Sequence, residues 1–491
     1  MESQAQTTPA RALAAALYRA AVEGAAPFPH TRDAVRAWLT TNIEAETNKR
    51  VHVVALGKAA SAMTAGALDA LAEQGRTVTS GVLVSSHLPT PSELGRTRVL
   101  PEAIDVRVGD HPVPGPASAE AAEAIDNAVR RVEPGDVVLV LLSGGTTALT
   151  AAPLPRFTQQ VGDIGRAQAH IANFAQTLLD SGLAIHEMNA LRRRVLRWGA
   201  GRLAVALHAR GAAHIAVFAI SDVIGDAPEV IGSGPCSAEP LGETDFLALL
   251  DAHDLRDSLE RDMALFLGVQ GNASAPAVPL PSDPAFEHVS YTFVARNRDA
   301  LDALAAAARN AGISHVSVHS TPLTGEAAEL GDDLARQALD LAASLPRKER
   351  ALWIAGGEPV VHLRSTVERA LAADDEDGTP DEPMKGGRMQ ALALAAALRL
   401  EERALDTDDF AWRVTVLAAG TDGRDGPTDA AGAIVDCATP LNARRLGKRR
   451  PERDLATGRS WFSLDAAGDL LRTGPSGTNV MDVVALLIDA R

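Results

Sequence analysis

Short, mostly apolar runs recur along the chain, and each of them ends abruptly in glycine and polar residues. Continuous apolar runs of this length are typical of strands that are buried on both faces. Ala-rich stretches with helical spacing lie between the runs, for example at 117–131 and 167–179. This alternation predicts an α/β protein with mainly parallel sheets that helices cover on both faces. The runs occupy residues 51–56, 137–142, 214–220, 351–355 and 413–419.

The predicted elements form two α/β units. N-terminal helices are expected within residues 1–50, and the first unit spans 51–267. Residues 268–284 are rich in Pro, Gly, Ser and Ala, which indicates a linker. The second unit, 285–491, begins with a strand at 289–295 and a helix at 298–311. Strands are expected to begin near Val51, Gly81, Ile104, Val137 and His214 in the first unit, and near His315, Leu352, Val360 and Val414 in the second.

Composition excludes several classes of protein. The 491 residues are 46% hydrophobic but only 3% aromatic, so the core is aliphatic. A net charge of −16 argues against nonspecific nucleic-acid binding and against an anionic membrane surface. The start of the chain lacks a basic segment followed by an apolar one, and no apolar run is long enough to span a membrane. We therefore expect a soluble cytoplasmic protein. Its two cysteines, Cys236 and Cys437, provide neither a disulfide framework nor a zinc spacing.

Residues that could bind a ligand or take part in catalysis lie where the apolar runs end. In open α/β sheets ligands bind at the carboxyl ends of the strands, so five polar junctions predict a shared active-site rim. The alternative is ordinary turn chemistry, which also uses Gly, Ser and Asp. The junction residues are Gly57 and Lys58; Ser143, Gly144, Gly145, Thr146 and Thr147; Ser221 and Asp222; Gly356, Gly357 and Glu358; and Gly420, Thr421, Asp422, Asp425 and Asp429.

The turn at 143–147 offers unobstructed backbone N–H groups and three hydroxyls, expected at a helix N-terminus. It is interpreted as a cradle for a phosphate or carboxylate, with a Thr-capped turn as the alternative. Lys58 is one of only five lysines, and it follows a fully apolar run. Its ammonium is therefore expected in the crevice, where a point charge can hold a transferring phosphoryl group.

Three carboxylates, Asp422, Asp425 and Asp429, share one short loop and repel one another unless a cation lies among them. A magnesium–nucleotide complex would supply that cation. Asp222, Glu358, Asp422 and Asp425 are the candidates for binding Mg²⁺ or for orienting an acceptor hydroxyl, and the sequence does not separate them.

Two further groups of cations suggest anion binding. Arg388 follows Lys385 and two glycines at the start of an Ala/Leu helix, where the helix dipole disfavours a cation unless an anion is present. Arg192, Arg193 and Arg194 are consecutive, and at least one of them is expected on a solvated helix face. Arg192 or Arg193 is expected to face a ligand or an internal carboxylate. His111, which precedes a proline, is interpreted equally as a substrate contact or as a structural loop residue.

Two common nucleotide motifs are absent from the sequence: G-x-x-x-x-G-K-[ST], and G-x-G-x-x-G after a strand. Their absence argues against a P-loop ATPase and against an ordinary NAD-binding domain.

Taken together and in order, the segments resemble the glycerate 2-kinase family that carries a C-terminal MOFRL domain. The matching stretches include ALGKAASAM at 55–63, GDHPVPGPAS at 109–118, LLSGGTTAL at 141–149, KGGRMQALALAAAL at 385–398, AGTDGRDGPTDAAGAIVD at 419–436 and TGPSGTNVMDVV at 473–484. The resemblance implies transfer of the γ-phosphoryl group of ATP, with Mg²⁺, to a hydroxyl of D-glycerate or a related sugar acid. It also implies a Rossmann-like first domain and an active site in the cleft between two α/β domains.

The resemblance makes Lys58 and Arg388 the leading catalytic cations. Residues 143–147, Arg192 and Lys385 are assigned to substrate or phosphate binding. The nucleotide site is assigned to Gly356, Gly357, Glu358, Gly420, Asp422, Asp429 and Asn479, and a magnesium site to Asp222, Asp422 and Asp425. The expected partners are ATP and a small hydroxy acid, with no nucleic acid and no membrane, and a homodimer is the assembly considered.

The chain departs from the family pattern. Thr146 and Thr147 stand where SGGGSAL is usual, and Met389, Gln390 and Ala391 stand where GGRNQE is usual. We expect Met389 and Ala391 to shape the acceptor pocket and to shift specificity away from glycerate. Two alternatives to a kinase are a hydroxypyruvate reductase and a nucleotide-binding protein that has lost catalysis.

Overall fold

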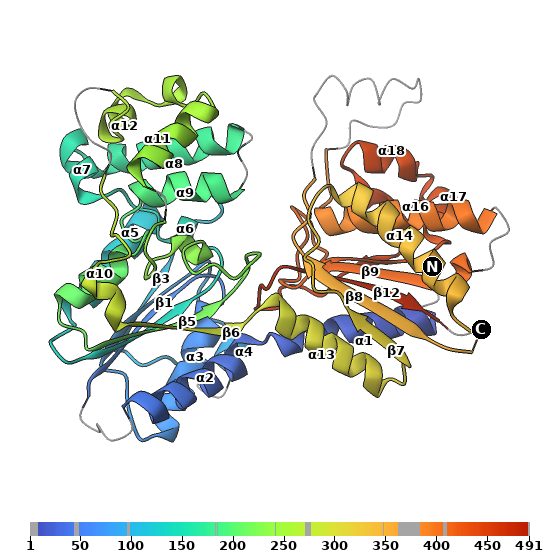
Figure 1. The fold of residues 1–491 in the computed structure, drawn as a ribbon, viewed down its shortest axis with the longest axis horizontal. Coiled ribbons are helices and arrows are strands. Elements are labelled where there is room, and N and C mark those ends of the chain that lie inside the picture. Colours follow the sequence, from blue (N-terminus) through green and yellow to red (C-terminus); the bar gives the residue numbers. More distant parts are fainter. Residues whose placement is uncertain are drawn as a thin grey trace. The chain divides into compact units, whose positions relative to one another are not determined.

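The computed structural model of the 491-residue chain describes residues 8–43, 49–95, 99–181, 183, 185–240, 242–270, 276–346, 348–361, 383–405 and 410–489. The chain forms two compact units (Figure 1). One, called here the parallel-sheet unit, is Pro27–Ala295. The other, the mixed-sheet unit, combines Met1–Ala26 with Arg296–Arg491.

The parallel-sheet unit is built on a six-stranded sheet in the order β3-β2-β1-β4-β5-β6, in which every neighbouring pair is parallel. The order reverses direction between β1 and β4, and such a switch point is where open α/β sheets bind ligands. All residues of β1, β2 and β4 are buried, as expected for strands covered on both faces. The strands are β1 Val51–Leu56, β2 Ser80–Ser85, β3 Ile104–Val108, β4 Val137–Leu142, β5 His214–Ile220 and β6 Val289–Ala295.

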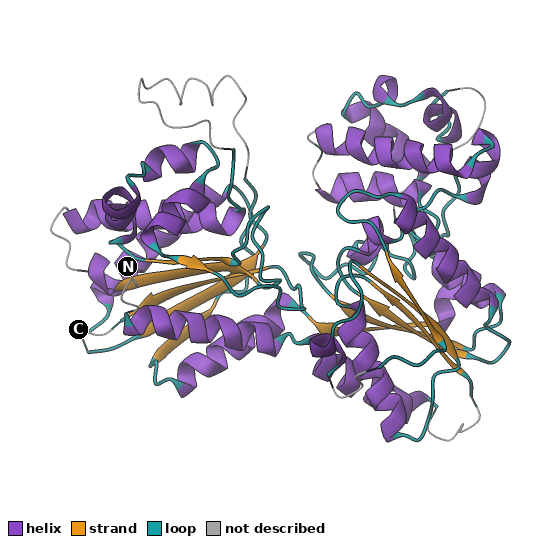
Figure 2. Cartoon of the chain, turned by 180° about the vertical axis from the view of Figure 1, so that it is seen from behind, coloured by secondary structure: helices purple, strands orange, loops and turns teal. Residues whose placement is uncertain are grey.

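Helices cover this sheet on both faces (Figure 2). On one side α2 (Pro27–Asn42) packs with α3 (Ala60–Glu73), and on the other α5 (Pro116–Arg130) and α10 (Arg202–Ala209) share a core with the strands. Short helices α4 (Pro91–Leu94) and α6 (Thr146–Leu149) follow β2 and β4. A separate core forms within a helical layer made of α7 Pro155–Val161, α8 Ile164–Asp180, α9 Ile185–Val195, α11 Glu243–Ala252 and α12 Arg261–Phe266. Single-turn helices are η1 Ile231–Ser233, η2 Arg256–Ser258 and η3 Pro284–His288.

The mixed-sheet unit has a six-stranded sheet in the order β11-β10-β9-β12-β8-β7. Only β7 and β8 pair in parallel, and the other pairs are antiparallel. The strands are β7 His315–Val318, β8 Ala351–Gly357, β9 Val414–Gly420, β10 Gly432–Val435, β11 Leu470–Leu471 and β12 Asp482–Ile488.

Helices α1 (Pro9–Gly24) and α13 (Asn297–Asn310) pack together on one face of the mixed sheet, and α14 (Ala327–Ser344) and α16 (Arg388–Leu405) on the other (Figure 1). Around α16 lie α17 Thr439–Gly447, α18 Pro451–Ala456 and α19 Ser460–Ala467, and η4 Ala411–Arg413 precedes β9. None of the helices that the structure describes is both long and apolar enough to cross a bilayer.

The α/β class and the parallel first sheet are confirmed, but four details of the sequence prediction are wrong. The second sheet is mainly antiparallel. The strand at 289–295 pairs with β5 and completes the first sheet, so residues 268–284 precede its last strand and do not separate the units. At Val360 the structure shows an isolated bridge to Glu326 and no strand. The N-terminal helices also divide, because α1 belongs to the mixed-sheet unit and α2 to the parallel-sheet unit.

A buried ionic contact ties α1 to the far end of the sequence. The guanidinium of Arg11 bonds to Asp436 (Nε to Oδ2, 2.8 Å), to Thr439 (3.2 Å) and to both oxygens of Asp469. The side chain of Asp469 is only 1% exposed. Two turns further along α1, the buried Tyr18 hydroxyl donates to the carbonyl of Gly420 at 2.8 Å.

Replacing Arg11 should therefore destabilise the mixed-sheet unit. Arg11→Ala leaves a buried carboxylate without its cation, a change that costs about 3–5 kcal/mol when a buried pair is broken. Arg19→Ala, on the exposed side of the same helix, is the matched control and should change stability by less than about 0.5 kcal/mol. Urea unfolding of both variants measures the difference, and equal unfolding free energies would show that the Arg11 contacts do not hold α1.

Candidate active site

The ends of β1 and β4 meet at the switch point of the parallel sheet. Gly57 has φ +118°, and a Cβ there would overlap both the Oγ and the carbonyl oxygen of Ser143. The N–H of Lys58 donates to the carbonyl of Gly144 at 2.9 Å, and the N–H of Ala59 donates to Ser143 Oγ at 3.1 Å. The two strand ends are thus locked together, and position 57 has to be glycine.

The Lys58 side chain lies over Gly145. Its Cγ and Cε are 3.1 and 3.3 Å from the point where a Cβ on Gly145 would lie, and His111 Cδ2 is 3.5 Å from that point. Burial, together with the nearby charge of Lys58, lowers the pKa of His111 to about 4, so its imidazole is neutral at pH 7. Lys58 forms no ion pair with any carboxylate in the part of the chain that the structure describes.

The turn at 143–147 presents backbone groups and one hydroxyl. Ser143 Oγ accepts from Ala59, as above, and Thr146 Oγ1 donates to the carbonyl of Ser143 at 2.8 Å, so both hydroxyls serve the turn itself. Thr147 Oγ1 bonds to Ser233 Oγ at 2.7 Å and lies at the edge of a cavity. The N–H groups of Gly144 and Gly145 have no partner among the described residues. Because α6 has only four residues, these N–H groups matter more here than the dipole of the helix.

The three consecutive arginines are not solvated, contrary to the expectation for at least one of them. Arg193 is buried against Glu239 (Nε to Oε2, 2.6 Å) and donates to the carbonyl of Glu229, which confirms the prediction of an internal carboxylate partner. Arg194 donates to the carbonyl of Pro276 and lies over the ring of Phe246. Arg192 lines a cavity that also includes Gly145, Thr147 and His111.

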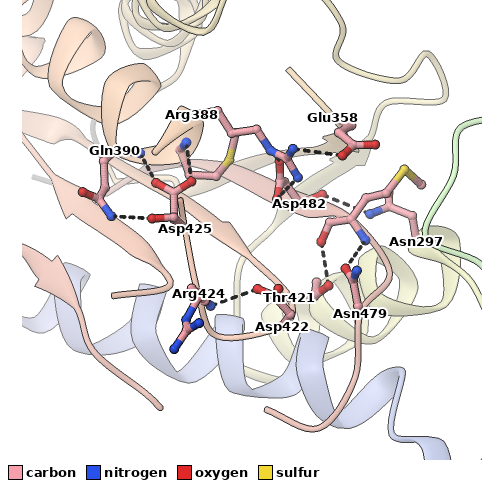
Figure 3. A network of polar contacts seen from close by, with 12 residues as sticks. Asn297, Glu358, Arg388, Gln390, Thr421, Asp422, Arg424, Asp425, Asn479 and Asp482 are labelled. Carbon is pink, nitrogen blue, oxygen red and sulfur yellow. Dashed lines mark hydrogen bonds and ion pairs between the residues drawn. The ribbon is translucent and has the colours of Figure 1, made fainter. Parts of the chain in front are cut away.

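A second polar group occupies the edge of the mixed sheet (Figure 3). Arg388, the first residue of α16, donates from Nε to Asp482 Oδ2 at 2.6 Å and from Nη1 to Glu358 Oε1 at 2.9 Å. Asp482 begins β12 and lies opposite Gly357 and Gly420, the last residues of β8 and β9. An antiparallel strand therefore brings its first residue to the edge where its two neighbours end. The anion expected beside Arg388 is supplied by the protein itself.

Asp425 caps α16 from a neighbouring loop. Its two oxygens accept from the N–H groups of Met389 (3.2 Å) and Gln390 (2.8 Å), and Gln390 Nε2 donates to the carbonyl of Asp425 (Figure 3). Burial, and then repulsion by Asp482, raises the pKa of Asp425 to about 7, while burial raises the pKa of Asp482 to about 6 against the attraction of Arg388. Asp425 therefore positions the helix, and neither of its oxygens lacks a partner.

Asp422 lies in the same group. Its Oδ1 accepts from the N–H of Arg424 at 2.9 Å, and this oxygen and Oδ1 of Asp482 are each 3.3 Å from the point where a Cβ on Gly420 would lie. Within the described ranges no three acidic, His or Cys side chains are placed to hold a metal ion. Asp222 follows β5 and is half-buried in the parallel-sheet unit.

The remaining predicted residues have structural contacts. A Cβ on Gly356 would overlap Asn297, whose Nδ2 donates to the carbonyls of Val480 (2.7 Å) and Asp482 (3.0 Å), and a Cβ on Gly357 would overlap Leu323. Asn479 accepts from the N–H of Met481 at 3.3 Å. These contacts hold the loops at the ends of β8, β9 and β12 in place.

Lys385 and Asp429 contact Trp461, outside the group around Arg388. Lys385 Nζ is 3.1 Å from the centre of the Trp461 ring. Asp429 accepts from Trp461 Nε1 (2.8 Å) and Arg472 Nε (2.9 Å), and these bonds, that of Arg472 foremost, lower its pKa to about 2.

Comparison with known proteins identifies the family. Residues 13–268 match a domain of unknown function, DUF4147, and residues 351–482 match the MOFRL family. The D-glycerate 2-kinase of Thermotoga maritima is 30% identical over 441 residues, which cover 89% of this chain and 91% of that protein. The glycerate 2-kinase of Pyrococcus horikoshii is 28% identical and covers 96% of both chains. The chain belongs to the glycerate 2-kinase family with a MOFRL domain. The crystal structure of the T. maritima glycerate kinase matches with a TM-score of 0.71 at 27% identity, covering 97% of this chain and 99% of that one.

Two departures from the family pattern lie away from any acceptor pocket. Met389 is fully buried and Ala391 is 8% exposed, and both belong to the apolar core of the mixed-sheet unit. The expectation that they shape the acceptor pocket is wrong, because the first turn of α16 places their side chains in the core. Only the backbone of Met389 takes part in the polar group.

Asp482 was missed by the sequence analysis. Its signal was present, since an acidic residue directly precedes the apolar run 483–488. The predicted acidic residues of this group follow apolar runs, whereas Asp482 stands at the start of β12. Asn297 and Ser233 were also missed, and neither stands in a motif that distinguishes it.

Gly57 provides a test of the locked strand ends. Gly57→Ala should destabilise the parallel-sheet unit by about 2–4 kcal/mol, because the positive φ costs about 1–2 kcal/mol and the overlap with Ser143 forces a backbone shift. Gly135→Ala is the matched control, since its φ is +94° but nothing lies within 4 Å of the new Cβ. Urea unfolding should give the larger loss for Gly57→Ala, and equal losses would mean that backbone conformation alone, without close approach, explains the glycine.

Asp425 provides a test of the buried carboxyl group. With a folded pKa near 7 and an unfolded value of about 3.9, Asp425 stabilises the fold fully below about pH 4, and this contribution is lost as pH rises through 7. Relative to wild type, Asp425→Asn should therefore gain unfolding free energy as pH rises from about 4 to about 7, and the difference should level off above pH 7. Asp340 is exposed, and the unfolding free energy of Asp340→Asn should differ from that of wild type by the same amount at every pH. A constant difference for both variants would contradict the raised pKa.

Proposed function

We propose that this chain transfers the γ-phosphoryl group of ATP to a hydroxyl of a small hydroxy acid, D-glycerate to 2-phosphoglycerate or a related sugar acid. Its relatives from T. maritima and P. horikoshii are named as glycerate 2-kinases, which supports the reaction class. The observation that carries the proposal is the position of Lys58. It lies over Gly145 at the switch point, beside a neutral His111 and unpartnered backbone N–H groups.

In the proposed reaction the bond from the γ-phosphorus to the bridging oxygen breaks and ADP leaves, while the acceptor oxygen bonds to phosphorus and releases its proton to water. Charge develops on the phosphoryl oxygens, and preorganised cations and N–H groups stabilise such charge most where water is excluded. Lys58 would neutralise that charge, while the N–H groups of Gly144 and Gly145 would bind phosphoryl or carboxylate oxygens. His111, being neutral, would orient the acceptor by a hydrogen bond.

Arg388 is the second proposed phosphate contact. Asp482 and Glu358 hold its guanidinium by three bonds, so it is fixed before any ligand binds. One third of the side chain is exposed, which leaves a face for a phosphate oxygen. The nucleotide would lie along the glycine-lined strand ends at Gly356, Gly357 and Gly420, with Asp422 and Asn479 nearby. The assignment of Lys385 and Asp429 to ligand binding receives less support, because both already contact Trp461.

Magnesium fits this group as part of a nucleotide complex. Mg²⁺ commonly keeps several waters and takes one or two carboxylates besides phosphate oxygens, so a complete protein cage is not required. Asp422 and Asp482 each place a carboxylate oxygen 3.3 Å from the point where a Cβ on Gly420 would lie, so both carboxylates are at the same strand end and either could supply a ligand. The ion would neutralise charge on the β- and γ-phosphates. Magnesium binding, a cytoplasmic location and pairing of two copies remain predictions.

A hydride-transferring reductase is not favoured. The parallel sheet has the strand order of dinucleotide-binding folds, but its first strand-to-helix turn carries Lys58, Ala59 and Ala60 where those folds place further glycines.

Lys58→Ala should lower kcat about 10²-fold or more, in the range seen when one electrostatic stabiliser is removed. The fold should be retained, because the side chain fills no core position. The measurement is ADP release coupled to a dehydrogenase, over a panel of three- to five-carbon hydroxy acids, with the exposed Lys348→Ala as the matched control. If Lys58→Ala keeps wild-type kcat on the best acceptor, Lys58 is not part of the catalytic machinery.

A further inference from the structure

We propose that the cavity beside Gly145 binds the apolar substituent of the acceptor, so that the preferred substrates are 2-hydroxy acids with about five to seven carbons. This inference rests on the proposed kinase function and specifies the substrate class of the same site. The cavity has a volume of about 440 Å³ and lies wholly within the parallel-sheet unit.

The cavity is larger than glycerate requires. At roughly 30 Å³ for each water-sized group, the seven non-hydrogen atoms of glycerate fill at most about 200 Å³. Pockets of 300–1,000 Å³ are typical of sites for larger ligands. The cavity therefore leaves about half of its space for groups that glycerate lacks.

The wall of that extra space is apolar. Helix α8 and the end of α9 supply most of it, and the 112–114 loop supplies the rest. Leu179 and Val113, at 51% and 54% exposure, are left open to water, a position that a bound apolar group would cover. The lining offers few polar side chains that could bind extra hydroxyls, namely His111, Thr147, Gln176 and Arg192. The apolar lining residues of the two helices include Ile171, Phe174, Leu179 and Val195.

Arg192 supplies the complementary charge. Among the residues that the structure describes, its Nε is buried without a partner, and its Nη2 donates only to the carbonyl of Ala175, at 3.3 Å. No carboxylate in the described part of the chain pairs with it, whereas the next residue, Arg193, is paired with Glu239. A guanidinium has five N–H donors, and leaving them unsatisfied in a buried place is unfavourable. A ligand carboxylate would satisfy them by a two-pronged contact.

The lining then orders the groups of the acceptor. Its carboxylate would bind Arg192, its carbon chain would follow the α8 wall, and its hydroxyl would point to Gly145 and Thr147, over which the Lys58 side chain lies.

The test is the dependence of kcat/KM on chain length for straight 2-hydroxy acids of three to eight carbons, with glycerate alongside. Each buried methylene is worth about 0.8 kcal/mol, so kcat/KM should rise about 3- to 4-fold per carbon until the cavity is full. Ala172→Phe, which fills the cavity from α8, should abolish that rise. Ala169→Phe, exposed on the same helix and outside this lining, should keep it.

Arg192→Gln should raise KM about 10²-fold for every acid and leave the affinity for ATP unchanged. Ligand-observed NMR of 2-hydroxyhexanoate binding to wild type, Ala172→Phe and Arg192→Gln gives a readout that does not depend on turnover. Turnover of glycerate with no rise along the series, or equal binding of 2-hydroxyhexanoate to wild type and Ala172→Phe, would overturn the inference while leaving the kinase function intact. Binding of the longer acids without ADP release from any acid would instead overturn the kinase function.

Discussion

The placement of Lys58 depends on a contact that leaves no room for a side chain at position 57. The backbone of Gly57 lies against the Ser143 carbonyl and hydroxyl, and this close approach joins the ends of β1 and β4. Because the strand order of the parallel sheet reverses between these two strands, the loops that follow them diverge to opposite faces and leave a crevice. The backbone of Lys58, directly after this glycine, is fixed by its bond to the carbonyl of Gly144, and the aliphatic part of its side chain lies over Gly145.

The mixed-sheet unit holds several carboxylates close together around a single guanidinium. Asp482, Asp425 and Glu358 come from β12, a loop and the end of β8, and Arg388 from the start of α16. Burial raises the pKa values of the two aspartates, while backbone N–H groups and Arg388 favour their charged forms. A carboxyl group with this balance takes up a proton more readily than an exposed aspartate does.

Sequence reasoning identified the features that follow from local chemistry. Continuous apolar runs gave the buried strands, and a rare lysine after a strand indicated the position that the structure places beside Gly145. Strand direction in the mixed sheet could not be predicted in the same way, because an apolar run such as 483–488 reads alike in both directions and its pairing is set by distant partners. For the same reason Asp482, at the start of a strand, was not expected beside residues at the ends of others. Met389 was misplaced because the residues that surround Arg388 in sequence are separated by the helical turn, which directs one toward the carboxylates and the next into the core.

Phosphoryl transfer from ATP to a carbon-bound hydroxyl is the reaction proposed for this chain, and ³¹P NMR observes that event directly. With ATP, Mg²⁺ and a hydroxy acid, we expect the γ-phosphate resonance to disappear while ADP and a new phosphomonoester appear in equal amounts. The new resonance should show three-bond coupling to the proton on the acceptor carbon. Appearance of inorganic phosphate alone, or an unchanged ATP spectrum with every hydroxy acid including glycerate, would contradict the account.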